Sequence, residues 1–128
     1  MEGNTPLIEA SFRNSTEIAE ILISKGADVN IIADNSQTAI LYAAMNGNIE
    51  IMKDLLKKGA DPNSRSEDGN TPLLHVAWAG YTEIVKLLLS QKTDINAKNN
   101  GNATALQLAE WNGHPDIVTL LKKAGAKD

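Results

Sequence analysis

Residues 70–90 read NTPLLHVAWAGYTEIVKLLLS, a stretch that contains the start and stop signals of two short helices. Thr71 followed by Pro72 favours a helix start, because threonine caps an N-terminus and proline lacks an N–H that would be unbonded there anyway. Gly80 supplies a left-handed stop, and Glu83 places an acid in the first turn of the second helix. The stretch therefore predicts a helix–turn–helix unit.

The same pattern occurs four times along the chain at an offset of 33 residues. We call the residues that occupy one place in successive copies a column. The most regular columns are Thr5, Thr38, Thr71 and Thr104; Leu7, Ile40, Leu73 and Leu106; Ala10, Ala43, Val76 and Ala109; Ile18, Ile51, Ile84 and Ile117; and Leu22, Leu55, Leu88 and Leu121. A period of this length is typical of a stacked array in which each unit buries its apolar face against its neighbours.

The second helix of each copy is expected to end at a glycine that can adopt a left-handed conformation, namely Gly26, Gly59 and Gly125. Lys92 occupies this column in the third copy. A lysine forced into that conformation costs on the order of 1 kcal/mol. We therefore expect Lys92→Gly to raise the melting temperature, unless the third helix ends differently. The linking segments 29–37 and 62–70 are rich in Asn, Asp, Ser and Gly and predict projecting turns.

Asn-Thr-Pro-Leu at 4–7 and 70–73 and Gly-Ala-Asp-Val-Asn at 26–30 resemble the hallmark segments of the ankyrin repeat. The resemblance implies an all-α fold, an ankyrin-repeat solenoid of four stacked helix–turn–helix units with hairpin-like fingers. We expect a single domain over 1–128, with repeats at approximately 2–34, 35–67, 68–100 and 101–128. The family's usual histidine, three residues after the threonine, is missing in all four units, so its polar link to the neighbouring turn should be absent or replaced. The residues found there are Ile8, Leu41, Leu74 and Gln107.

Bulky side chains fill the column seven residues after the threonine, namely Phe12, Met45, Trp78 and Trp111. The resemblance places this column near the end of the inner helix, on the concave surface, where partner contacts are common. The predicted partner-binding set is completed by Arg13, Asn46, Ala79 and Asn112 in the next column and by Asn35, Gln37, Glu67, Asp68, Asn70 and Asn100 on the fingers. Rigid aromatics would anchor the partner, with amides and acids as an adaptable rim. The competing interpretation is that each aromatic only packs over the seam to its neighbour.

The leading hypothesis for function is a non-catalytic protein–protein interaction module, with self-association also open. An alternative is a small-ligand site in which Trp78 and Trp111 stack a planar or nucleotide-like molecule. Such a site also needs Lys or Arg beside the rings for phosphate, and the candidates are Arg13 and Lys98. A third hypothesis is an engineered or fragmentary repeat scaffold, although the irregular columns resemble natural drift more than an idealised design.

The composition argues against other classes of protein. The chain has no cysteine, which excludes disulfides and thiolate chemistry, and its net charge of −4 argues against a general nucleic-acid or anionic-membrane surface. His75 has no accompanying nucleophile or carboxylate cluster, so we expect a partly buried interface residue and no metal, cofactor or enzyme activity. No apolar run approaches the ~20 residues that a bilayer requires. We expect a cytoplasmic, intracellular protein.

Both ends of the array carry polar residues that suit the outer faces of terminal units. Lys122 and Lys123 replace the apolar or small residues of the preceding copy, so the last helix can face water. Glu9, Arg13 and Glu20 are expected to do the same at the start of the array.

Overall fold

The computed structural model describes residues 4–127, which form eight α-helices and no β-strand. In chain order the helices are α1 (Pro6–Phe12), α2 (Thr16–Ser24), α3 (Ala39–Asn46), α4 (Ile49–Lys57), α5 (Pro72–Ala79), α6 (Thr82–Leu89), α7 (Ala105–Trp111) and α8 (Pro115–Lys123). They follow one another as four pairs, which we call units 1 to 4. The all-helical solenoid predicted from the sequence is confirmed.

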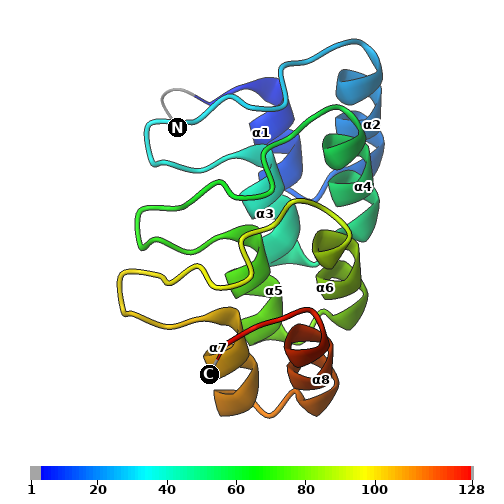
Figure 1. Ribbon diagram of the computed structural model, residues 1–128. Coiled ribbons are helices and arrows are strands. Elements are labelled where there is room, and N and C mark those ends of the chain that lie inside the picture. The colour runs from blue at the N-terminus through cyan, green and yellow to red at the C-terminus, as the bar shows by residue number, and fades with distance from the viewer. Residues whose placement is uncertain (1–3, 128) are drawn as a thin grey trace.

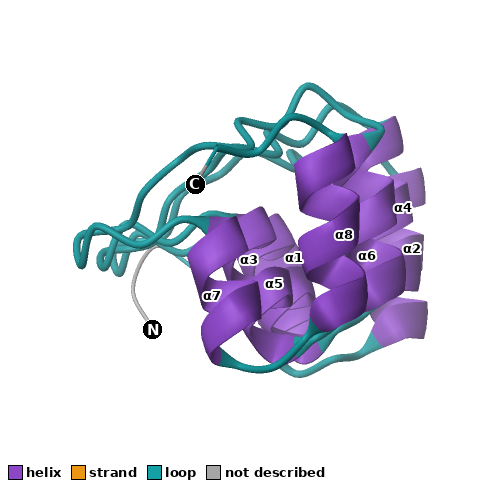
Figure 2. Cartoon of the chain, turned by 60° about the horizontal axis from the view of Figure 1, so that its bottom comes forward, coloured by secondary structure: helices purple, strands orange, loops and turns teal. Residues whose placement is uncertain are grey.

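The helices form two layers (Figure 1). The inner layer contains α1, α3, α5 and α7, and the outer layer contains α2, α4, α6 and α8. Figure 2 shows that the loops between units extend past the inner layer, away from the outer one. We call these loops finger 1 (29–38), finger 2 (62–71) and finger 3 (95–104). The surface where the inner layer meets the fingers is the inner face.

Each inner helix begins at its column threonine, whose Oγ1 accepts a hydrogen bond from the backbone N–H three residues on. The donors are Ile8 to Thr5 (3.1 Å), Leu41 to Thr38 (3.3 Å), Leu74 to Thr71 (3.3 Å) and Gln107 to Thr104 (3.3 Å). In unit 4 the Gln107 Oε1 also accepts from the Thr104 N–H at 3.0 Å, which completes a capping box. The stop predicted at Gly80 is correct, since this residue has positive φ, and Gly47, Gly113 and Asn14 do the same at the equivalent places in the other units.

The core is shared between units. Ile51, Ile84 and Ile117 of the outer helices are at most 3% exposed, and Leu55, Leu88 and Leu121 are fully buried. Since a single helix pair cannot enclose its own apolar face, these columns are stabilised by the neighbouring unit. The stacking of the units therefore fixes the distances between the side chains that project from the inner helices.

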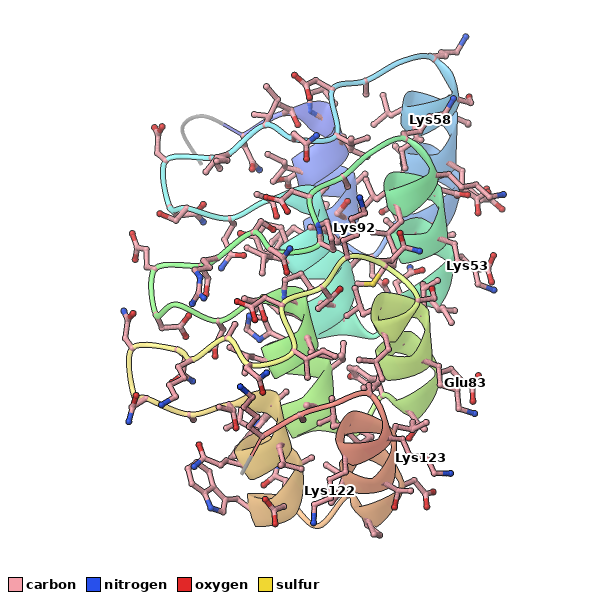
Figure 3. The ribbon with its side chains drawn as sticks, in the orientation of Figure 1. Lys53, Lys58, Glu83, Lys92, Lys122 and Lys123 are labelled. Atoms are coloured by element: carbon pink, nitrogen blue, oxygen red, sulfur yellow. The ribbon has the colours of Figure 1, made fainter. Side chains whose placement is uncertain are left out.

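The start of the array carries the predicted polar residues, since Arg13 and Glu20 are exposed, but it also exposes apolar side chains. Glu9 and Arg13 form an ion pair on α1, as a water-facing end requires. On α2, however, Ile18 is 56% exposed and Ile21 is 54% exposed. Ile18 belongs to a column that is buried in every later unit because the preceding unit covers it, and no described residue covers it in unit 1. At the other end the expectation is correct, since Lys122 and Lys123 are exposed (Figure 3).

Lys92 is not strained, because it is absent from the described residues with positive φ. The third outer helix ends at Leu89, and the Thr93 hydroxyl then donates to the Leu88 carbonyl at 2.8 Å. The chain turns without a left-handed residue at this column, so the expectation that Lys92→Gly relieves strain was wrong. The alternative, that this helix ends differently from the others, is the correct one.

A column of asparagines links successive units and was not recognised in the sequence. The Asn30 side chain donates to the Gly59 carbonyl at 3.0 Å and accepts from the Asp61 N–H at 2.8 Å. Asn96, two units further on, accepts from the Lys127 N–H at 3.0 Å. A carboxamide suits this place because it offers a donor and an acceptor to one turn of the next unit.

Candidate partner-binding surface

Four bulky side chains occupy equivalent places on the inner helices, and all are substantially exposed. The exposed fraction is 49% for Phe12, 45% for Met45, 50% for Trp78 and 66% for Trp111. The residues just before the last three on their helices, Ala44, Ala77 and Glu110, include two alanines that are fully buried, so the row stands at the boundary between core and solvent. Each of the four side chains therefore keeps about half of its surface or more accessible to a second molecule.

The backbone beneath this row is held by the neighbouring units. Asn46 donates to the Ser11 carbonyl at 2.9 Å, and Asn112 donates to the Trp78 carbonyl at 2.7 Å. The His114 Nε2 also lies 3.0 Å from the Trp78 carbonyl. The amide donors of Asn46 and Asn112 are therefore committed to linking units, a different role from the adaptable rim predicted for them. They hold the backbone at Phe12 and Trp78 against the next unit.

Phe12 partly serves the seam between units 1 and 2. Its ring lies edge-on to that of Tyr42, with centroids 5.1 Å apart and an angle of 64° between the planes. Tyr42 is buried, and its hydroxyl accepts a hydrogen bond from Asn35 at 3.2 Å. Sequence reasoning missed Tyr42, which connects two of the predicted partner-binding residues.

A cleft between fingers 1 and 2 brings five of the predicted residues together, and we call it finger cleft 1. Its volume is about 340 Å³. It is lined by Asn35, Gln37, Met45, Glu67 and Asp68 of the predicted set, together with Ser66 and His75. Residues that are far apart in the sequence thus form one polar recess beside Met45 of the bulky row.

A second recess, finger cleft 2, lies on the other side of His75, towards unit 4. Its lining is Asn70, Leu74, His75, Trp78, Asn99 and Leu108. It contains neither Trp111 nor any Lys or Arg, the residues that the hypothesis of a stacked nucleotide-like ligand needs. Of the predicted partner-binding residues, Trp78 and Asn70 line this cleft.

The remaining predicted residues lie outside these two clefts. Arg13 is exposed and paired with Glu9, and Ala79 is exposed next to Trp78. Asn100 donates from its side chain to the Glu67 carbonyl at 2.9 Å and so joins fingers 2 and 3. Arg65, which was not predicted, strengthens the same junction by donating to the Lys98 carbonyl at 2.8 Å.

A family model described as "Ankyrin repeats (3 copies)" matches residues 1–66 and 40–128. The chain belongs to the ankyrin repeat family. No curated protein sequence matches it. Ankyrin repeats are generally protein–protein interaction modules and are typically non-catalytic.

Within residues 4–127 of this ankyrin array two ionisable groups have shifted pKa values, and both line finger cleft 1. The hydroxyl of Ser66 hydrogen-bonds to the Asp68 carboxylate and lowers its pKa, with the backbone and side chain of Asn70 acting in the same direction against the effect of burial. Burial lowers the pKa of His75, and the negative charge of Asp68 offsets only part of this shift. His75 is therefore a neutral imidazole at pH 7, as its ordinary pKa is already about 6.5.

Residues 4–127 of the array contain no group of three or more His, Cys, Asp or Glu side chains that could hold a metal ion. None of the helices in this part of the chain has the length and apolar character needed to cross a bilayer. His75 is partly buried between units, as expected.

Proposed function

We propose that this ankyrin array binds a folded protein partner along its inner face, with the bulky row as anchors and the fingers as a polar rim. The observation that supports the proposal most strongly is the exposure of all four bulky side chains, which is at least 45% for each. Large side chains held half in solvent on a rigid backbone are typical of interface anchors, because little conformational entropy is lost when a partner covers them.

The dimensions of the row favour a macromolecule over a metabolite. Packed helices lie about 8–10 Å apart, so three steps along the inner layer span roughly 25–30 Å. An aromatic side chain presents ~150–250 Å², and at half exposure four bulky residues offer roughly 300–500 Å². A specific protein partner covers ~800 Å² on each side. The fingers would supply the rest of the contact area.

The test compares Trp78→Ala and Trp111→Ala with the unsubstituted chain, measuring partner capture from a native lysate and the melting temperature. Ile21→Ala is the matched control, since Ile21 is 54% exposed and lies on the outer layer. Either tryptophan substitution should reduce capture at least tenfold, the effect of losing about 1.4 kcal/mol or more at an anchor. The control should capture normally.

The melting temperature separates binding from packing. Because each indole is at least half exposed, its removal should change the melting temperature by only a few degrees. If both tryptophan variants retained capture but lost most of their stability, the indoles would belong to the core and the proposal would be wrong. Light scattering on the same samples distinguishes a foreign partner from self-association through the row.

A further inference from the structure

The outer helix of unit 1, α2, stands at the end of the outer layer and presents an apolar stripe to solvent (Figure 1). Ile18 is 56% exposed and Ile21 is 54% exposed. Leu22 is half-buried, although the other members of its column are fully buried. The three positions follow the i, i+3, i+4 spacing that gathers side chains on one side of a helix. In units 2 to 4 the same side of the outer helix is covered by the neighbouring unit.

The outward surface of unit 4 has no matching apolar stripe. Gln107 occupies a column that is apolar and buried in the other units, and Lys122 occupies the column of Ile23. Glu110 stands where the other units have a buried serine or alanine. A head-to-tail stack of chains would press these polar groups against Ile18 and remove them from water without partners, which is costly. The apolar end of the array therefore suits another apolar end better than the polar one.

Opposite charges flank the stripe at the two ends of α2. Glu17 lies in the first turn and Lys25 is the C-cap residue, and both are exposed. Neither belongs to the two ion pairs found within residues 4–127. Each is four positions from Ile21, so two antiparallel copies of α2 that cross at Ile21 bring Glu17 of each copy opposite Lys25 of the other. The antiparallel arrangement also opposes the two helix dipoles favourably.

We propose that the stripe on α2 docks on the same stripe of a second copy of this chain, which gives a two-fold symmetric dimer with antiparallel α2 helices. In such an interface every contact occurs twice. The two Ile21 side chains meet at the centre, and a pair of Glu17 with Lys25 closes each end. A hollow of about 310 Å³ beside Glu17 leaves room for the aliphatic stem of the lysine from the second copy. The hollow is lined by Ser15, Thr16, Glu17 and Ile18.

The size of the surface predicts a weak dimer. A specific, stable interface covers ~800 Å² of each partner. With nine residues α2 is only ~13 Å long, so this helix supplies part of that area. We expect a dissociation constant of roughly 10–100 μM. Trp78 and Trp111 lie on the inner helices, outside this interface, so the dimer does not compete with the proposed partner binding.

Sedimentation equilibrium of the full chain from about 1 μM to about 1 mM measures the association, and the mean mass should rise from one chain towards two. Ile18→Gln and Ile21→Gln should each weaken the association about tenfold or more, because they remove apolar area from the interface. Both side chains are more than half exposed, so the melting temperature should change by only a few degrees. A loss of association in these variants therefore cannot come from unfolding.

Exchanging the charges tests the antiparallel arrangement. In low-salt buffer, Glu17→Lys alone and Lys25→Glu alone should each weaken the association about tenfold, because like charges then face each other. An equimolar mixture of these two variants should associate at least as tightly as the unsubstituted chain, since opposite charges meet again at both ends. Glu50→Lys and Lys58→Glu are the matched controls, because they make the same changes in the same columns on α4 (Figure 3 labels Lys58). Both controls should associate normally.

A mass of one chain at every concentration, full association by both isoleucine variants, or a mixture no tighter than its separate components would each overturn the proposed dimer. Loss of association in Trp78→Ala and Trp111→Ala alone would overturn it as well and would assign the contact to the bulky row. Capture of a foreign partner is a separate readout. The variants of α2 should capture normally, and the tryptophan variants should dimerise normally, so that failure of one proposal leaves the other standing.

Discussion

Asn63 holds the turn that contains Lys92, because its side-chain amide donates to the Lys92 carbonyl at 2.9 Å. The Asn63 oxygen also accepts from the Asp94 N–H at 2.8 Å. The same pair of contacts joins Asn30 to Gly59 and Asp61 one unit earlier. One side chain therefore links units 2 and 3 even though the turn it binds lacks the usual glycine.

Asn63→Ala should destabilise the array by about 1–2 kcal/mol, since two hydrogen bonds of about 0.5–1.5 kcal/mol each are lost at a half-buried site. Urea unfolding followed by circular dichroism measures the change. Asp34→Ala, on an exposed position of finger 1, is the control and should stay within about 0.5 kcal/mol of the unsubstituted chain. An equal effect of both substitutions would show that the asparagine column does not couple the units.

Lys92→Gly should lower the melting temperature by a few degrees. The backbone at Lys92 is outside the left-handed region, so glycine relieves nothing there and only increases the entropy of the unfolded chain, at a cost of about 0.5–1 kcal/mol. Gly59→Lys is the converse experiment. Gly59 has a φ of 88°, and a lysine there should cost on the order of 1 kcal/mol or more. A higher melting temperature for Lys92→Gly would mean that the turn is strained after all.

His75→Leu should reduce the loss of stability between pH 7 and pH 5. Burial lowers the pKa of His75 in the folded chain, so the unfolded chain binds the proton more readily. The contribution of the neutral imidazole is fully present above its ordinary pKa of about 6.5 and declines as the pH falls below that value. Leucine is the residue found in this column in unit 4, as Leu108.

The measurement is the free energy of unfolding in urea at half-unit pH steps. Asp68 also makes the folded chain less stable as the pH falls, but in a lower pH range. Its pKa is lowered in the folded chain, so its contribution to stability is lost as the pH falls from about 3.8 downward. His75→Leu should still show the loss of stability that Asp68 causes at low pH. If His75→Leu lost stability between pH 7 and pH 5 as steeply as the unsubstituted chain, His75 would be equally easy to protonate in the folded and unfolded states.

The helices of each unit could be predicted from the sequence because the residues that start and stop them act locally. Thr71 with Pro72 and Gly80 act within one turn of their own helix, so they can be recognised without knowledge of neighbours. The bulky column was also found, because Trp78 and Trp111 lie 33 residues apart on equivalent faces. Their exposure requires the packed structure.

What the sequence does not reveal depends on contacts between units. Asn46 and Asn63 resemble any surface amides until the next or preceding unit brings a carbonyl within reach. The exposure of Ile18 is hidden because its column is uniform, and only its place at the first unit leaves it uncovered.

The central claim is that the bulky row contacts the partner, and the two tryptophans of the chain both belong to that row. Labelling with 5-fluorotryptophan therefore gives two ¹⁹F signals, both from the inner face. Adding the partner recovered by capture should shift or broaden both signals, as each half-exposed indole is covered. Unchanged ¹⁹F signals in a sample where the partner is demonstrably bound would contradict the account.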